Sequence, residues 1–179
     1  MLTQTRRKVF PLDVKPEDID LIDIASSLGK QCRYNGHVDR FYSVAEHCVI
    51  ISRALERDGY PPIVQKQGLF HDAQEEIVSD LIKPLKNALL EKGIEWHDFE
   101  HPIERIVAQK FGLPWPYDKA VGVYDKHIVR DEKNQLKYDL TDDWSTFGIP
   151  PDGLGVQIEG LEWREATTAF LKRYEELYG

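Results

Sequence analysis

The sequence predicts an all-α protein, a single compact bundle of about six or seven helices that spans residues 1–179 as one domain. Three observations predict this fold class. Apolar residues recur three and four positions apart in most segments, as they do on one face of a helix. Proline, glycine and capping residues stand where these segments begin and end. A chain of 179 residues with 41% hydrophobic and 30% charged residues can also bury one core without disulfide bonds.

The first helix is expected over residues 16–29. Pro16 suits a first helical turn, acidic residues follow it at the positive end of the helix dipole, and Gly29 suits a helix end. Residues 1–15 carry no helical stripe. There we expect an extended arm or a short strand around residues 7–12.

The second helix is expected over residues 44–57. Ser43 and Glu46 stand at the spacing of a capping box, and Gly59 follows the helix end. A histidine lies among the apolar residues of its stripe, which are Val44, His47, Cys48, Ile51, Ala54 and Leu55.

A third helix is expected over residues 62–79, and it carries the dipeptide His71-Asp72 directly after an apolar pair. Gly68, on the same face, would let a neighbouring helix approach closely. Burying an unpaired polar group costs about 1–3 kcal/mol. The imidazole and the carboxylate therefore need partners, either in the core or in a bound ligand.

The rest of the chain predicts four more helices and one long loop. A turn and a short helix that ends at Gly93 come first, followed by helices over 95–112 and 117–140. In the second of these, Asp125 shares a face with apolar residues and is expected to be buried. Residues 141–160 are rich in turn formers and predict a loop, a lid or a partner contact. The last helix, over 161–178, turns these residues inward: Trp163, Ala166, Phe170, Tyr174 and Leu177.

Charge and composition limit the classes of partner. Lys and Arg total 23 against 31 Asp and Glu, a net charge of −8, which disfavours a polymer nucleic acid as partner and leaves a mononucleotide open. No apolar run reaches the roughly 20 residues that span a bilayer, and the N-terminus lacks the apolar core of a signal peptide. We expect a cytoplasmic protein without a membrane partner. Cys32 and Cys48 show no metal-binding or disulfide spacing and are expected to be reduced.

Three predicted helices each carry a metal-type ligand within an apolar stripe. These ligands are His47, the pair His71 and Asp72, and Asp125. Taken singly, a buried histidine or a capping aspartate would explain each of them. Together, two imidazoles and two carboxylates form a mixed N/O site suited to Mn, Fe, Co, Ni or Zn, and one ion would satisfy all four groups.

This order of a His, a His-Asp dipeptide and a distant Asp resembles the HD-domain superfamily of metal-dependent phosphohydrolases. "SVAEH" and "HDAQEEIVSDLIKPLK" are similar to segments of the HD-domain 5'-deoxynucleotidases and of the small phage-type dATP triphosphohydrolases. "CRYNGHVDRFYSVAEH" and "FGLPWP" also resemble short phage and bacterial HD hydrolases. The resemblance covers most of residues 18–130 and implies an HD-domain fold with His47, His71, Asp72 and Asp125 as the metal ligands.

The resemblance also implies roles for further residues. Glu75 matches the glutamate that orients or deprotonates the attacking water, and Glu76 beside it is expected to be a solvated helix acid. Asp80 matches a further catalytic acid, which orients a side chain or binds a second ion such as Mg. Arg33 and Lys86 match the cations that hold phosphate oxygens. Each of these could instead be an ordinary surface charge.

One departure concerns the substrate pocket. The 5'-deoxynucleotidases tend to have Arg followed by Trp before the first metal ligand, whereas here Tyr34 follows Arg33, and His37 comes soon after. Tyr34 is a candidate for stacking on the substrate. The basic residues His37, Arg40 and Lys83 favour a longer phosphate chain.

The predicted function is therefore hydrolysis at the 5' phosphate of a deoxynucleotide. The first substrate to consider is a dNTP such as dATP, split into deoxynucleoside and triphosphate, and the alternative is a 5'-deoxynucleotidase acting on dNMPs. An HD phosphodiesterase and a non-catalytic metal- or nucleotide-binding regulator are further alternatives. The aromatic-rich loop and the last helix indicate a homo-oligomer.

Overall fold

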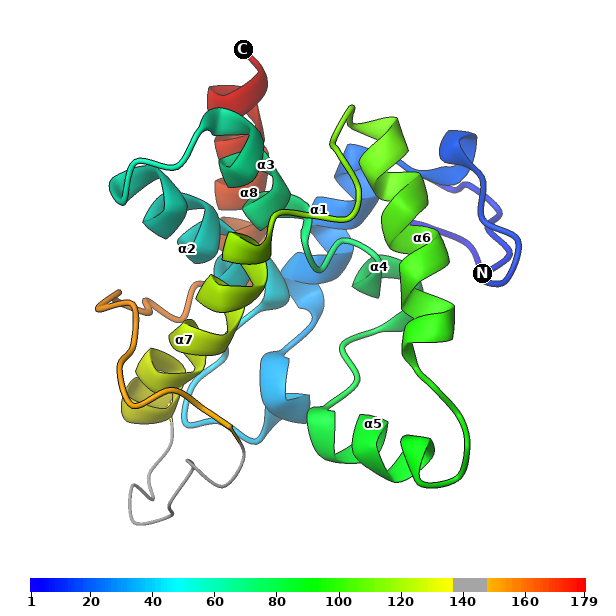
Figure 1. Ribbon diagram of the computed structural model, residues 1–179. Helices are drawn as coiled ribbons and strands as arrows, with labels where there is room; N and C mark the ends of the chain where they lie inside the picture. Colours follow the sequence, from blue (N-terminus) through cyan, green and yellow to red (C-terminus); the bar gives the residue numbers. More distant parts are fainter. Residues whose placement is uncertain (137–147) are drawn as a thin grey trace.

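The computed structural model describes residues 1–136 and 148–179, and within them it confirms the all-α fold class (Figure 1). Eight α-helices and two short 3-10 helices, η1 and η2, form the described part of the chain. Their bounds are η1 Pro16–Asp18, α1 Leu21–Lys30, η2 Arg33–Gly36, α2 Val44–Arg57, α3 Pro62–Phe70, α4 Glu75–Val78, α5 Lys83–Leu90, α6 His97–Lys110, α7 Lys119–Leu136 and α8 Trp163–Tyr178. The described residues contain no strand, and the arm near residues 7–12 has a single bridge between Leu2 and Lys8.

Helix α2 lies at the centre, packed against α1, α3, α7 and α8 (Figure 1). All residues of its predicted stripe are buried, including His47. The Ser43 side chain accepts a hydrogen bond from the Glu46 N–H, as a capping box requires. Glu46 does not return the bond and instead accepts three backbone N–H groups of residues 159–161. The start of α2 at Val44 is thereby fixed three residues before the candidate metal ligand His47.

The close approach of α3 to α2 depends on Gly68, as the sequence predicts. A Cβ atom at this position would lie 2.6 Å from Leu55 Cδ1 and 3.2 Å from Ile51 Cγ2, both in fully buried side chains of α2. A methyl group there has no room unless the core moves. Gly122 of α7, in contrast, has no atom within 4 Å of such a Cβ.

We expect Gly68→Ala to lower the free energy of unfolding by about 1–2 kcal/mol, because overpacking outweighs the gain in helix propensity. The matched variant Gly122→Ala should raise it by about 0.5–1 kcal/mol, since only the propensity changes. Urea unfolding of both variants measures the difference. A Gly68→Ala protein as stable as Gly122→Ala would show that α2 and α3 are not in tight contact.

The predicted helix over residues 62–79 is wrong in one respect, because it does not continue through His71. Helix α3 ends at Phe70, and α4 begins only at Glu75. Between them the N–H groups of Ala73, Glu75 and Glu76 bond to carbonyls three residues earlier, in the manner of a 3-10 helix. This tighter winding, which an apolar pattern does not reveal, turns His71 and Asp72 out of the regular helix face.

Two other boundaries differ from the prediction. The first helix begins at Leu21, because Asp20 is extended and its side chain caps Ile22 N–H, while Pro16 begins the separate η1. The short helix after the predicted turn is α5, which has no buried residue and lies at the edge of the molecule (Figure 1). Leu85, Leu90 and Ile94 are exposed there.

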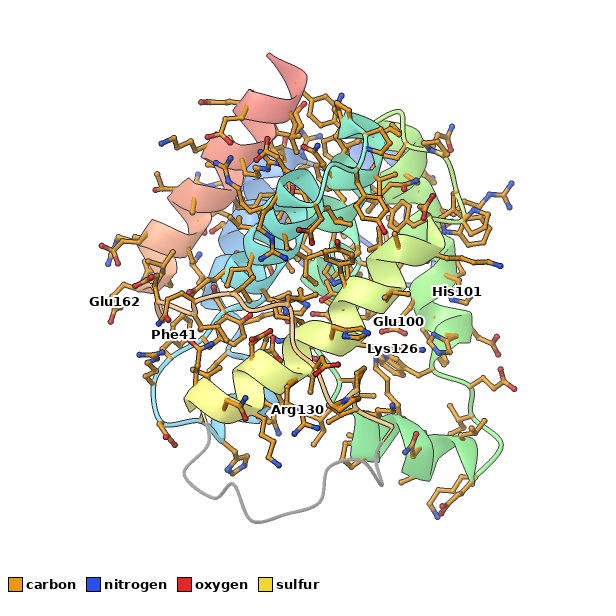
Figure 2. All side chains as sticks on the ribbon, turned by 60° about the vertical axis from the view of Figure 1, so that its left-hand side comes forward. Phe41, Glu100, His101, Lys126, Arg130 and Glu162 are labelled. Atoms are coloured by element: carbon orange, nitrogen blue, oxygen red, sulfur yellow. The ribbon has the colours of Figure 1, made fainter. Side chains whose placement is uncertain are left out.

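Residues 148–162, here called the strap, connect back to α8 without regular structure. Of the predicted loop 141–160, residues 141–147 lie outside the described part of the chain, as do residues 137–140 of the predicted helix over 117–140. Side chains of α7 bind the strap backbone: Asp131 accepts two N–H groups, and Gln135 bonds to the backbone of Val156 and Ile158. Phe41 and Glu162 meet where the strap joins α8 (Figure 2).

Among the described residues, no helix has the length and apolar character needed to cross a membrane.

Candidate metal centre

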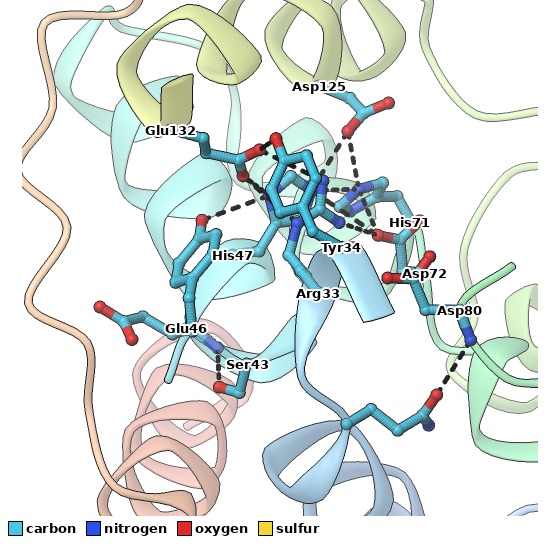
Figure 3. Close-up of polar contacts among 12 residues, drawn as sticks. Arg33, Tyr34, Ser43, Glu46, His47, His71, Asp72, Asp80, Asp125 and Glu132 are labelled. Carbon is cyan, nitrogen blue, oxygen red and sulfur yellow. Dashed lines mark hydrogen bonds and ion pairs between the residues drawn. The ribbon is translucent and has the colours of Figure 1, made fainter. Parts of the chain in front are cut away.

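The four residues predicted as metal ligands come together from three separate elements (Figure 3): His47, His71 and Asp125 form one group within ligand distance, and Asp72 lies beside both histidines. His47 comes from α2, His71 and Asp72 from the turns after α3, and Asp125 from α7. His47 Nε2 lies 3.3 Å from His71 Nε2, 3.1 Å from Asp125 Oδ1 and 3.6 Å from Asp72 Oδ2. His71 Nε2 lies 3.2 Å from Asp72 Oδ2 and 3.8 Å from Asp125 Oδ1.

These spacings fit the ligand shell of a small divalent ion. Ligands about 2.1 Å from a metal lie roughly 3.0 Å apart at right angles and roughly 3.4 Å apart at the tetrahedral angle. Three of the five distances given above, from 3.1 Å to 3.3 Å, lie in this range, while the His47–Asp72 and His71–Asp125 distances are longer, at 3.6 Å and 3.8 Å. The four groups could therefore hold one first-row metal ion with little movement.

The protons of the two imidazoles are directed away from this point. His71 Nδ1 lies 2.9 Å from the Gly68 carbonyl oxygen, which can only accept, and His47 Nδ1 lies 2.8 Å from Glu132 Oε1. Each neutral ring thus donates through Nδ1 and directs the lone pair of Nε2 at the other ligands. Two lone pairs and two carboxylates facing one another need a cation between them.

Without a metal, a proton on His71 can supply the positive charge that the two carboxylates need. His71 is buried, which lowers its pKa, but Asp72 and the other neighbours raise the pKa of His71 well above its ordinary value. Although desolvation opposes it, hydrogen bonds with His47 and His71 hold the pKa of Asp125 well below its ordinary range. A metal competes with these protons, so its affinity should fall as the pH falls.

A second group of three, Cys48, His71 and Asp72, also lies within ligand distance. Burial raises the pKa of the Cys48 thiol. Because the thiolate is the form that binds metals, a neutral Cys48 is a poor ligand. The cluster with His47 and Asp125 is the better candidate.

The centre opens to solvent on the α7 side. His47 is fully buried, whereas 42% of the Asp125 side chain is exposed. The sequence-based expectation of a buried Asp125 is therefore wrong: the residue shares the face of Val121 and Ile128 but stands where that face leaves the core. This opening gives a ligand access to the cluster.

Glu132 is a site residue that the sequence analysis missed. Its carboxylate is fully buried and contacts His47 Nδ1 through Oε1, while Oε2 accepts a short hydrogen bond from the Tyr34 hydroxyl (Figure 3). Although burial opposes it, Arg33 and then His47 lower the pKa of Glu132 to about 2. Glu132 follows Asp125 by two helical turns on one face of α7, a signal that could have identified it.

The backbone of η2 is strained in a way that serves this contact. Tyr34, Asn35 and Gly36 have φ values of 57°, 56° and 78°, in the left-handed region. This conformation costs roughly 1–2 kcal/mol for a residue other than glycine. It brings the Tyr34 hydroxyl to Glu132 and places Arg33 Nη1 3.6 Å from Asp72 Oδ2. The strained backbone of η2 thus accompanies the placement of Arg33 beside the cluster.

Glu75 and Asp80 lie beside the four ligands and are joined by Gln31. The Gln31 side-chain amide donates to the Glu75 backbone carbonyl and accepts from the Asp80 N–H, at 3.0 Å each. Between them Ser79 has a φ of 66°, again strained. Glu75 is buried and its Oε2 has no hydrogen-bond partner. Burial, Asp72 and Asp80 raise the pKa of Glu75 well above its ordinary value.

The other residues predicted to contact the substrate do not lie directly beside the four candidate ligands. Lys86 Nζ donates to Glu100 of α6 at 2.6 Å, and the Lys86 charge partly opposes the rise in the pKa of Glu75. His37 is exposed at the end of η2. Arg40 donates to the Ile158 carbonyl in the strap at 2.7 Å. The structure therefore brings Arg33 and Tyr34 next to the cluster, Lys86 into its neighbourhood, and directs Arg40 to the strap.

Glu76 is not the solvated acid that the sequence predicts. Only 7% of it is exposed, because α4 packs against α1, and its Oε2 has no hydrogen-bond partner. Burial, followed by Asp23 and Asp20, raises the pKa of Glu76 to about 8. Glu75 and Glu76 therefore point in different directions from one short helix, Glu75 toward the cluster and Glu76 toward α1.

The raised pKa of Glu76 makes stability depend on pH. Its contribution is complete below the unfolded pKa of about 4.5 and is lost as the pH rises toward 8, since only the unfolded state ionises freely. We expect Glu76→Gln to match the wild type at pH 5 and to exceed its free energy of unfolding by on the order of 2 kcal/mol at pH 8. Urea unfolding at both pH values tests this, with Glu91→Gln on the exposed surface as control. A difference that does not change with pH would contradict the account.

The fold and the site together define an all-α protein with a histidine–carboxylate cluster at the meeting point of α2, α7 and the turns after α3. The chain belongs to the family of the uncharacterized protein YfdR of Escherichia coli (strain K12), with 30% identity over 165 residues, 92% of this chain and 87% of YfdR. An uncharacterized protein of Rhodobacter capsulatus is 31% identical over 186 residues, 96% of this chain and 91% of its own length. No family model matches the chain.

Proposed function

We propose that the protein is a metal-dependent phosphohydrolase of the HD-domain type that acts on the 5' phosphate of deoxynucleotides. The observation that carries the proposal is the convergence of two imidazole lone pairs and two carboxylates from the His47, His71-Asp72 and Asp125 positions. This order of residues resembles the HD superfamily, and the spacing fits one divalent transition metal. Mn, Fe, Co, Ni and Zn all suit such ligands.

A bound metal would polarise a phosphoryl oxygen and lower the pKa of a bound water. The residues of the chain supply the rest of the mechanism. Glu75 offers an unpartnered carboxylate oxygen beside the cluster, where it can act as the general base that takes a proton from water, and burial with the neighbouring acids raises its pKa. Arg33, 3.6 Å from Asp72, neutralises charge that develops on the phosphate.

Asp80 is assigned a supporting role. The Gln31 amide fixes its backbone to that of Glu75, so the two acids move as one unit. We assign to Asp80 the orientation of Arg33: burial raises the pKa of Asp80, and the charge of the nearby Arg33 opposes this rise. Asp80 could also bind a second ion such as Mg, and the described residues offer it no further ligand within metal-binding distance.

The preferred substrate is a dNTP, with dATP first, and the products would be the deoxynucleoside and triphosphate. Lys86 and His37 are the residues that the sequence indicates for the outer phosphates, and Lys86 is paired with Glu100. Because Arg40 is bound to the strap, fewer cations remain for a polyphosphate than the sequence indicates. A 5'-deoxynucleotidase acting on dNMPs is therefore the alternative. The exposed Leu85, Leu90 and Ile94 of the α5 region support a homo-oligomer.

Product analysis by chromatography tests the proposal. The protein is incubated with dATP or dAMP in Mn, Co, Zn or Mg, with Asp72→Ala as the inactive control. Deoxyadenosine formed from dATP without dADP or dAMP identifies a triphosphohydrolase, and turnover of dAMP alone identifies the nucleotidase. If the protein hydrolyses neither dATP nor dAMP while a known HD hydrolase is active in parallel, the proposal is refuted. A phosphodiesterase or a metal-binding regulator would then be favoured.

A further inference from the structure

Glu132 joins the two halves of the site through one carboxylate. Oε1 accepts from His47 Nδ1 at 2.8 Å and lies 3.3 Å from Arg33 Nε. Oε2 accepts from the Tyr34 hydroxyl and lies 3.5 Å from Arg33 Nη2. Oε1 therefore lies between a candidate metal ligand and Arg33 of η2, and Oε2 contacts η2 through both Tyr34 and Arg33, the proposed phosphate-binding residue.

The burial of Glu132 is costly unless it is paired. None of the residue is exposed, and an unpaired carboxylate in such a position costs several kcal/mol. The neighbouring buried acid, Asp131, binds the strap, where it accepts the N–H groups of Leu154 and Gly155. Glu132 binds no backbone group of the strap, and all its contacts given above are with side chains of the site.

These contacts fix two geometries at once. The bond to Nδ1 sets the tautomer and ring orientation of His47, so that Nε2 faces the other three ligands. The bonds to Tyr34 and Arg33 hold η2 in its left-handed conformation, which the backbone alone disfavours. Removing the carboxylate would release the ring and the strained segment together.

We propose that Glu132 is a positioning residue that couples metal binding at His47 to the placement of Arg33 for the substrate phosphate. The second half of this inference rests on the proposed function. The first half concerns metal affinity alone and does not depend on any substrate.

The test begins with metal titration of the metal-free protein by calorimetry, which requires no activity. Glu132→Gln keeps the side-chain shape but removes the charge, and it should weaken Mn or Zn binding about 10- to 100-fold, as is usual for the outer partner of a ligating histidine. The matched variant Asp131→Asn should stay within twofold of the wild type. Unchanged metal affinity in Glu132→Gln would overturn the proposal.

A second variant tests the role of Oε2 separately from that of Oε1. Tyr34→Phe removes only the hydroxyl that bonds Oε2, so metal affinity should stay within twofold while KM for the substrate rises threefold or more. A KM equal to that of the wild type would overturn the coupling to Arg33. If Glu132→Gln does not fold, as judged by circular dichroism, Glu132→Asp replaces it, with a shorter reach and the same expected loss of metal affinity.

Failure of the proposed function gives a different pattern. In that case no variant, the wild type included, hydrolyses any nucleotide, yet the calorimetric difference between Glu132→Gln and Asp131→Asn persists. That pattern would support the link between Glu132 and His47 and overturn the part of the proposal that concerns the substrate phosphate.

Discussion

Replacing Asp72 with alanine is expected to abolish metal binding and to lower the hydrolysis rate by at least about 10³-fold. Asp72 supplies one of the two anionic ligands, and its Oδ2 lies 3.2 Å from His71 Nε2 and 3.6 Å from His47 Nε2. Without it, two neutral imidazoles and Asp125 remain, which is one charge too few to balance a divalent ion. Metal content after dialysis, measured by elemental analysis, and the initial rate check the two effects.

Cys48→Ala is the matched control for this variant, because Cys48 belongs to the second possible group of ligands. We expect Cys48→Ala to bind metal within threefold of the wild type, since its thiol is neutral and lies in the core. Loss of metal in Cys48→Ala with retention in a His47→Ala protein would place the ion in the other group and contradict the assignment of His47 and Asp125.

Glu75→Gln is expected to lower kcat by about 10²- to 10⁴-fold while metal affinity stays within a few-fold of the wild type. Glu75 is buried beside the cluster but is not among the groups close enough to hold the ion. As a base it acts in its ionised form, and burial, Asp72 and Asp80 raise its pKa. The wild-type rate should therefore fall as the pH drops below that raised pKa. In Glu75→Gln the pH–rate profile should no longer show this fall at acidic pH.

Glu76→Gln is the control at the neighbouring position. Glu76 lies near Asp23 of α1 and Asp20 at its N-cap, and it does not face the cluster. It should keep the wild-type pH–rate profile, although its stability at pH 8 changes. Equal losses of rate in both variants would show that the short helix α4 matters only as a structural element, and a rate unaffected by Glu75→Gln would point to a regulator that binds metal without catalysis.

The sequence could predict the features that depend on residues close together in the chain. The apolar stripe of α2 identified a buried face with His47 in it, and small size at Gly68 predicted the contact with α2. Helical period and spacing placed His71, Asp72 and Asp125 on elements that meet. These features follow from residues three or four positions apart, which is the scale at which helical periodicity carries information.

Other features depended on tertiary contacts that no local pattern contains. The 3-10 turns after Phe70 are set by the demand that two adjacent side chains face one site. Glu75 and Glu76 look equivalent in sequence, yet α1 covers one and the cluster borders the other. Glu132 reads as an ordinary helix acid until Arg33, Tyr34 and His47 are seen around it.

The central claim is that His47, His71, Asp72 and Asp125 hold one divalent metal ion, and anomalous X-ray diffraction from crystals grown with Mn or Zn tests it most directly. Data collected at the absorption edge should show one strong peak about 2.0–2.3 Å from His47 Nε2, His71 Nε2 and one carboxylate oxygen each of Asp72 and Asp125. No peak at this point in metal-loaded crystals, or a peak held by other residues, would contradict the account.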